Sequence, residues 1–181
     1  MTVLIVFATV EGQTGKIADA VARTVRDTGR QAVLFDTAKR TAPVSFEGVR
    51  QVILAAPVHE RRHPETFEVF LAAHRASLAM CETLMLSVSL SASFEEGLEE
   101  AEEYVTEMAM RTGLTPDETM LVAGAIRSDR YDYFSQQVLR HVVLRDRDVD
   151  PGGPHEFTDW AALASAVTRF VGAEDAVTPG A

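Results

Sequence analysis

The residues best suited to binding a ligand follow the first hydrophobic segment of the chain. Residues 3–8 read Val-Leu-Ile-Val-Phe-Ala, which is typical of a buried strand, and Thr9, Gly12 and Thr14 come next, before a helical pattern begins. The first N–H groups of a helix have no helical partner, and the helix dipole favours an anion there. Threonine hydroxyls add donors, and glycine lets the backbone approach closely. This segment therefore predicts a phosphate-binding loop and, with it, a mononucleotide site.

The loop differs from two common nucleotide-binding motifs. It is not a Walker A loop, because Val10 stands where the upstream glycine would be and Ile17 stands where a hydroxyl would contact magnesium. The dinucleotide pattern G-x-G-x-x-G is also absent. The remaining pattern, Thr-x-x-Gly-x-Thr-Gly, is typical of a flavodoxin-type phosphate loop. An ordinary strand-to-helix turn capped by threonine is the alternative.

A second group of residues suited to chemistry contains two arginines flanked by two histidines. The segment His59-Glu60-Arg61-Arg62-His63 follows another hydrophobic run. Guanidinium groups can pair with substrate carboxylates in bidentate geometry, and a histidine can relay protons near neutral pH. The candidates for catalysis are therefore His59, Arg61, Arg62 and His63. The alternative is a solvated loop whose arginines only balance nearby glutamates.

Hydrophobic patterns also predict the elements that position these residues. Strands are expected at 2–8, 31–36, 49–57, 84–90 and 120–126, and helices at 13–28, 65–79, 94–112 and after Thr158. Apolar strands that alternate with helices indicate an α/β fold with a parallel sheet covered on both faces. Right-handed crossovers favour a doubly wound sheet of five strands in the order 2-1-3-4-5. A single domain is predicted over residues 1–172, followed by a flexible tail at 173–181.

In such a sheet, ligands bind outside the carboxyl ends of the strands. This rule selects three loops, at residues 9–14, 57–63 and 87–94. We expect the first loop to hold the phosphate and the other two to flank a ring of the same ligand.

The composition argues against several classes of protein. The chain has 181 residues, of which 46% are hydrophobic. No apolar run approaches the roughly 18 residues of a membrane span, and the first run resembles a strand rather than a signal peptide. A net charge of −10 argues against nucleic acid as a partner and, more weakly, against a strongly anionic membrane. A single cysteine, Cys81, and the absence of metal-ligand spacing predict a cytoplasmic, metal-free protein with a buried, unreactive thiol.

Two helical patterns have both a functional and a structural interpretation. Seven glutamates crowd residues 95–107, which fits a solvated helix face or a docking surface for a redox partner. An apolar stripe through Tyr131–Arg145 could cover the ligand, contact a hydrophobic substrate, or pack on the core or a second subunit. At the start of the last helix, we expect Thr158 to be the N-cap and Trp160 to pack in the core.

Three sequence blocks resemble one known family. Residues 7–14 read Phe-Ala-Thr-Val-Glu-Gly-Gln-Thr, residues 122–127 read Val-Ala-Gly-Ala-Ile-Arg before Arg130-Tyr131, and residues 157–160 read Phe-Thr-Asp-Trp. In order and spacing these blocks are similar to the menaquinone-dependent protoporphyrinogen dehydrogenases, which are flavodoxin-like proteins that bind FMN. The resemblance extends to about residue 171. That family carries an insertion after or within its fifth strand, and the corresponding segment here is residues 128–157.

The resemblance implies noncovalent FMN and a reaction that takes hydrogens from protoporphyrinogen IX, or a similar tetrapyrrole, and passes them to a quinone. The residues implied to bind the phosphate are Thr9, Glu11, Gly12, Gln13 and Thr14. The second flavin loop would be Pro57, Val58, His59 and Glu60, and the third Ser87, Val88, Ser89, Leu90 and Ser91. Porphyrin propionates would then be the carboxylates that Arg61 and Arg62 meet. In this scheme the flavin carries the chemistry, and the protein supplies position and electrostatics.

Two segments depart from the family pattern. Residues 57–63 contain neither the aromatic residue nor the glycine expected beside the flavin, so stacking would fall to His59 or Phe94. The insertion interleaves arginines with aspartates, whereas the family segment is basic and linked to membrane contact. This balance of charge lowers the expected attraction to an anionic membrane, so at most peripheral contact with its inner face is expected.

A flavodoxin-type electron carrier, with redox-partner proteins and no substrate of its own, is the main alternative. The acidity of the chain favours the carrier, whereas the insertion and the arginines at 61 and 62 favour the enzyme. A flavodoxin-like fold that has lost FMN is a further alternative. A phospho-receiver domain is disfavoured because it needs an acid at the end of the third strand, where Pro57 stands.

Overall fold

The computed structural model describes residues 1–39, 43–126 and 155–172. Its central sheet contains five parallel strands in the order β2-β1-β3-β4-β5. They are β1 (Thr2–Phe7), β2 (Gln31–Asp36), β3 (Val49–Pro57), β4 (Glu82–Ser89) and β5 (Glu118–Ala123). The predicted doubly wound topology is therefore confirmed.

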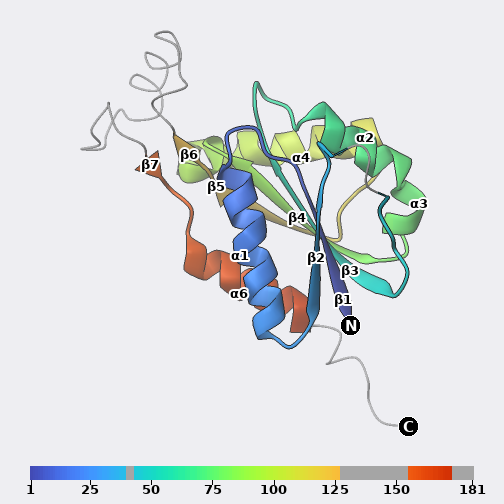
Figure 1. The fold of residues 1–181 in the computed structure, drawn as a ribbon. Helices are drawn as coiled ribbons and strands as arrows, with labels where there is room; N and C mark the ends of the chain where they lie inside the picture. Colours follow the sequence, from blue (N-terminus) through green and yellow to red (C-terminus); the bar gives the residue numbers. More distant parts are fainter. Residues whose placement is uncertain (40–42, 127–154, 173–181) are drawn as a thin grey trace.

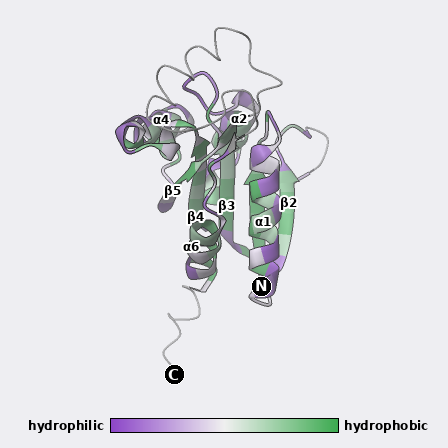
Figure 2. Ribbon diagram, turned by 90° about the vertical axis from the view of Figure 1, so that its left-hand side faces the viewer, coloured by the Kyte–Doolittle hydropathy of each residue, from purple (hydrophilic) through white to green (hydrophobic). Residues whose placement is uncertain are grey.

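Helices cover both faces of this sheet (Figure 1). On one face lie α1 (Gln13–Asp27) and α6 (Trp160–Gly172), and on the other lie α2 (Glu65–Ala73), α3 (Arg75–Leu78) and α4 (Leu98–Thr112). In β1, Val3 and Ile5 belong to the core under α1 and α6, whereas Leu4 and Val6 belong to the core under α2, α3 and α4. Figure 2 shows the central strands as hydrophobic along most of their length. Such strands need helices on both faces, because successive side chains point to opposite sides.

Two predicted helices are shorter than the sequence indicated. The helix expected at 65–79 is divided at His74, whose φ of −106° and ψ of 15° interrupt the helix between α2 and α3. The helix expected at 94–112 begins only at Leu98, because Phe94 has an extended backbone. Two short 3₁₀ turns, η1 (Ser91–Ser93) and η2 (Glu95–Gly97), precede it. None of the helices in the described residues is long and apolar enough to span a membrane.

The predicted fifth strand is interrupted at Gly124. Beyond it, β6 (Ala125–Ile126) pairs antiparallel with β7 (His155–Glu156). The insertion predicted at 128–157 lies outside the described residues except for its last three, and so do the stripe at 131–145 and the tail at 173–181. The domain boundaries remain a prediction.

All five parallel strands end at the same edge of the sheet, the upper edge in Figure 1. Three of the connections that leave this edge are residues 8–12 after β1, residues 58–64 after β3 and residues 90–97 after β4. This is the edge at which doubly wound sheets bind their ligands.

Candidate functional site

The loop between β1 and α1 has the geometry of an anion-binding site. Gly12 has a φ of 91°, a conformation that favours glycine, and its N–H donates to Thr9 Oγ1 at 3.0 Å. The Lys16 N–H donates to the Gly12 carbonyl at 3.2 Å, and no side chain of the described residues caps α1. The N–H groups of residues 13–15 therefore precede the first helical hydrogen bond and are available to an anion.

The same loop is joined to the segment that leads into α6. Gln13 is buried, and its Nε2 donates to Thr158 Oγ1 at 3.0 Å across 145 positions of the chain. The Thr158 hydroxyl in turn donates to the carbonyl of Ala123, at the end of β5, at 2.7 Å. The Oε1 of Gln13 is buried and accepts no hydrogen bond within the described part of the chain. A buried acceptor in this state is costly unless a ligand donates to it.

The loop after β3 contains a tight turn at residues 59–62. The N–H of His59 donates to the Arg62 carbonyl at 2.9 Å, and the N–H of Arg62 donates back at 3.1 Å. Between them, Glu60 and Arg61 have φ values of 49° and 64°, the pattern of a type I′ turn. For residues other than glycine this conformation costs about 1–2 kcal/mol each. The family pattern predicts a glycine in this segment, and here glutamate and arginine adopt the conformation that glycine favours.

Both arginines of the turn are paired with carboxylates on helices. Arg61 pairs with Glu100 and, at 3.8 Å, with Glu103, both on α4. Arg62 donates from Nε and Nη2 to Glu68 Oε2 on α2, at 3.1 and 2.6 Å. A substrate carboxylate would have to exchange with these partners, so recognition of propionates by the two arginines stays a prediction.

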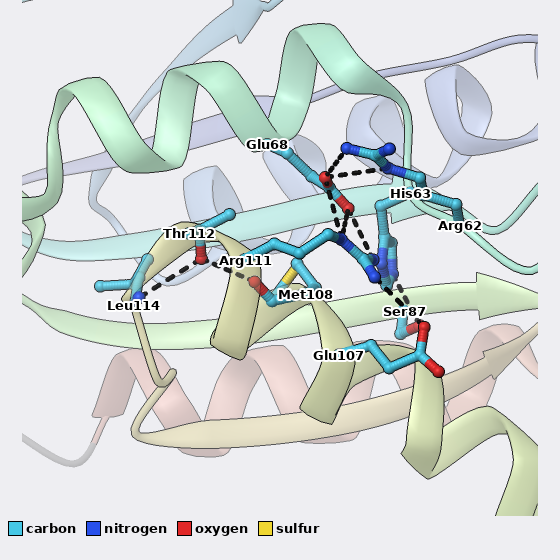
Figure 3. Close-up of polar contacts among 9 residues, drawn as sticks. All are labelled: Arg62, His63, Glu68, Ser87, Glu107, Met108, Arg111, Thr112 and Leu114. Atoms are coloured by element: carbon cyan, nitrogen blue, oxygen red, sulfur yellow. Dashed lines mark hydrogen bonds and ion pairs between the residues drawn. The ribbon is translucent and has the colours of Figure 1, made fainter.

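Glu68 joins this turn to two helices (Figure 3). Its side chain is buried, and besides Arg62 it accepts hydrogen bonds from Arg111, at the end of α4. The shortest of these runs from Arg111 Nη2 to Glu68 Oε1 at 2.8 Å. Burial acts to raise the pKa of Glu68, but the hydrogen bonds and charges of Arg111 and Arg62 outweigh it and lower the pKa below its usual value. Glu68 is therefore ionised at neutral pH and binds both guanidinium groups.

The two histidines of this segment lie in different environments. His63 is 1% exposed, and its Nε2 lies 3.1 Å from Ser87 Oγ on β4. Burial lowers the pKa of His63 to about 4, with Glu68 opposing and Arg111 reinforcing the shift. His59 is exposed, and its side chain has no hydrogen-bond partner among the residues that the structure describes. Of the two proposed proton relays, only His59 reaches the surface.

The third loop follows β4, which ends at Ser89, so the first residues of the predicted loop at 87–94 belong to the strand. Ser87 and Val88 are buried within β4, so their side chains lie below the edge of the sheet. Ser89, the last residue of the strand, accepts the N–H of Ala92 at its Oγ, at 3.1 Å. Leu90 follows at the edge itself. The part of the third loop that reaches the edge is therefore 89–91.

The rest of this loop is compact. Ser91 Oγ donates to Glu100 Oε2 at 2.9 Å, and Phe94 and Phe157 meet edge to face, with ring centroids 6.1 Å apart. A Cβ built on Gly97 would lie 2.3 Å from the Ser91 carbonyl oxygen. The loop can therefore pack in this way only with glycine at position 97.

Two predictions for the start of α6 are wrong. Asp159, not Thr158, caps the helix, because Asp159 Oδ1 accepts the N–H of Ala162 at 2.9 Å. Trp160 is 37% exposed, and its Nε1 donates to Glu156 Oε1 at 2.7 Å, so it does not pack in the core.

Cys81 is half-buried rather than buried, and burial raises the pKa of its thiol. A protonated thiol is a poor nucleophile, which agrees with the predicted lack of reactivity.

Most of the predicted cofactor residues are brought to the edge of the sheet. They are Thr9, Glu11, Gly12, Gln13, Thr14, Pro57, Val58, His59, Glu60, Ser89, Leu90 and Ser91. Sequence reasoning missed Glu68 and Arg111, because a single acid or base on a helix looks like an ordinary solvated residue. It also missed the Gln13–Thr158 contact, although the block at 157–160 pointed to that segment.

The residues at this edge fit FMN. Its phosphate matches the uncapped start of α1 and the left-handed Gly12. A donor on the ligand would satisfy the buried Gln13 Oε1. Two more loops stand at the same edge, where doubly wound folds hold flavins.

The fold and this edge define a doubly wound α/β protein with a phosphate-binding loop. The chain matches the family described as the flavodoxin domain over residues 4–149, and it belongs to that family. Membership supports FMN as its cofactor, as the sequence predicted.

The relatives agree with this assignment. Over 167 residues the chain is 25% identical to protoporphyrinogen IX dehydrogenase [quinone] of Escherichia coli K12, covering 91% of this chain and 92% of the relative. The name of this relative supports an oxidoreductase, and the resemblance noted in the sequence is confirmed. Flavodoxin 2 of Bacillus cereus matches with a TM-score of 0.55 at 15% identity, over 97% and 99% of the two chains. Rubredoxin oxygen:oxidoreductase of Desulfovibrio gigas matches with a TM-score of 0.56 at 12% identity; 97% of this chain is covered, but only 36% of that one. These two structures show the fold.

Proposed function

We propose that this chain is an FMN-dependent oxidoreductase that takes hydrogens from a tetrapyrrole-like substrate and passes them to a quinone. The observation that carries the proposal is an uncapped helix start behind a left-handed glycine, at the ligand-binding edge of a flavodoxin domain. The Escherichia coli relative, named for protoporphyrinogen IX and a quinone, supports the substrate class, because it matches over nearly its whole length.

In this proposal the N–H groups of residues 13–15 and nearby threonine hydroxyls would hold the phosphate of FMN. The turn at 59–62 and the loop at 89–94 would flank its ring. The isoalloxazine supplies the redox chemistry when it is bound. The protein orients the ring and limits the access of water to it.

His59 is the side chain proposed to hold or pass a proton at this site. It is exposed, stands at the first position of the turn, and has no side-chain partner among the described residues. Arg61 extends beside it, and its side chain is 61% exposed although it is paired with α4. In that position its guanidinium can attract an anionic substrate and exchange partners with a propionate.

An electron carrier without its own substrate is the second candidate, and one feature of α4 favours it. The exposed side of this helix carries Glu99, Glu102, Glu103 and Glu107. A surface of one charge can steer a basic redox partner. The acidic face is also what a solvated helix commonly shows.

The purified protein tests both proposals. The visible spectrum and chromatography of the cofactor released by heat identify the flavin. Anaerobic turnover with protoporphyrinogen IX and a soluble menaquinone analogue then separates the enzyme from the carrier. Flavin with turnover supports the enzyme, and flavin without turnover but with electron transfer to a reductase or ferredoxin supports the carrier. A protein that neither contains nor takes up FMN contradicts both.

A further inference from the structure

We infer that Glu68 is a positioning residue for the flavin: its ion pairs with Arg62 and Arg111 hold the turn at 59–62 against the ring and so set the affinity for the cofactor. This inference rests on the proposed function, because it takes the turn as one wall of the flavin site. Glu68 itself lies on α2 below the turn and acts through Arg62.

The contact geometry shows how one carboxylate holds two arginines. Glu68 Oε2 accepts both Nε and Nη2 of Arg62, while Nη2 of Arg111 donates to Oε1 and its Nε contacts both oxygens. Charge-assisted bonds of this kind are the stronger hydrogen bonds of proteins. The Glu68 side chain is 5% exposed, so water replaces these partners poorly.

The turn needs such an anchor because its backbone is strained. Two consecutive residues with side chains, Glu60 and Arg61, have positive φ values. A conformation of this kind persists only where the surroundings fix it. Arg62 is the residue that closes the turn, through its two backbone hydrogen bonds with His59. Its side-chain contact with Glu68 therefore fixes the turn at its closing position.

The two ends of the loop are already attached to β4, which leaves the turn as the part that depends on the helices. Before the turn, the Val58 N–H donates to the Val88 carbonyl at 2.7 Å. After it, His63 contacts Ser87. Between these points Arg61 forms solvent-exposed ion pairs with α4, and its guanidinium lies over the Tyr104 ring, 5.6 Å from the centroid. Exposed ion pairs and exposed cation–π contacts each contribute about 1 kcal/mol or less. The buried carboxylate of Glu68 is therefore the main side-chain anchor of the turn.

The decisive variant is Arg62→Ala, because it frees the turn while Glu68 stays paired with Arg111. Glu68→Gln is the second variant. The matched control is Glu107→Gln, which removes another carboxylate from Arg111 at 3.2 Å but contacts no residue of the turn. For each protein, flavin-free chain is titrated with FMN and with riboflavin by fluorescence. Amide hydrogen exchange at residues 58–63 and thermal unfolding of the flavin-free chain are measured alongside.

We expect Arg62→Ala to weaken the binding of FMN and of riboflavin by about tenfold, the scale of one lost charge-assisted hydrogen bond. Both flavins should be affected because the turn is placed at the ring, not at the phosphate. In Arg62→Ala, amide hydrogen exchange at residues 58–63 should accelerate. Glu107→Gln should match the wild type both in flavin binding and in amide hydrogen exchange. A purely structural role would lower the unfolding temperature without changing either dissociation constant.

The outcomes separate the inference from the proposed function. If the wild type binds flavin and Arg62→Ala binds it equally well, the inference is overturned and the proposed function stands. If Arg62→Ala weakens the binding of FMN but not of riboflavin, the inference is also overturned, because the effect then lies at the phosphate and not at the ring. If the wild type binds no flavin, the proposed function fails and the inference fails with it. Should Glu68→Gln not fold, Arg62→Ala still decides, because it removes only a half-exposed side chain.

Discussion

His63 Nε2 lies 3.1 Å from Ser87 Oγ, and this contact joins the loop before α2 to strand β4. The pair is buried beneath the turn at 59–62, and the other ring nitrogen, Nδ1, has no partner within the described residues. A histidine in this position is held neutral by its surroundings rather than by a charged partner.

This environment predicts a loss of stability in mild acid. The pKa of His63 is about 4 in the folded protein, whereas its ordinary value, which applies to the unfolded chain, is 6.5. As the pH falls from 6.5 towards 4, the unfolded chain binds a proton that the folded chain does not. Folding therefore becomes less favourable, by about 2 kcal/mol between pH 7.5 and 5. Urea unfolding at the two pH values measures this change.

The control for this prediction is His63→Gln, which keeps a polar group near Ser87 but does not titrate. Its overall stability should be lower, and its pH dependence between 7.5 and 5 should be smaller than that of the wild type. Glu68, with its lowered pKa, contributes only at more acidic pH. Equal pH dependence in the two proteins would show that His63 is not the titrating group.

Glu60→Gly should stabilise the protein. Glu60 has a φ of 49°, which glycine adopts without the steric cost of a side chain. We expect a gain of about 1 kcal/mol, or roughly 2–4 °C in unfolding temperature. Glu60→Ala is the control, because it removes the same charge but keeps a Cβ. If both variants gain equally, the charge and not the backbone is responsible.

Gly97→Ala should destabilise the loop after β4. Its Cβ would lie 2.3 Å from the backbone oxygen of Ser91, so one of the two segments must move. We expect a loss of about 2 kcal/mol in the free energy of unfolding. Gly15→Ala is the control, since its Cβ would meet only the Thr9 side chain, at 3.8 Å. Denaturant unfolding of the flavin-free chain measures the stability of both variants. Equal losses of stability in Gly97→Ala and Gly15→Ala would show that the contact with Ser91 is not the cause.

Gly12→Ala should weaken the binding of the FMN phosphate without affecting the binding of the flavin ring. With φ at 91°, the new side chain strains the loop and displaces the N–H groups that follow it. FMN binding should weaken about tenfold or more, while riboflavin, which has no phosphate, should change little. Fluorescence titration with both ligands measures the difference. If FMN and riboflavin lose affinity equally, the phosphate does not bind at this loop.

The sheet topology was predictable because it depends on patterns that are local in the chain. Runs such as residues 52–56 are apolar on both faces, and crossover handedness then leaves few arrangements. The phosphate loop was predictable for the same reason, since its threonines and Gly12 are neighbours in sequence. The resemblance to a known family added the ligand.

The contacts that hold the turn could not be predicted in this way. Glu68 and Arg111 are 43 positions apart, and only the packing of α2 against α4 brings them together. Similarly, the pattern around His63 does not show whether its ring faces solvent or the sheet. The fourth strand was expected to end at residue 90 and ends at Ser89, because sequence patterns fix the ends of a strand less well than its presence.

The first and last described helices share one face of the sheet. Ile17 and Val21 of α1 belong to the same core as Leu163 and Val167 of α6. During synthesis the strands that pack on α1 leave the ribosome well before α6 has been made, so the part of this core that α6 covers stays exposed until α6 emerges. Folding of this face is therefore completed only after α6 has been made, because α6 supplies part of its core.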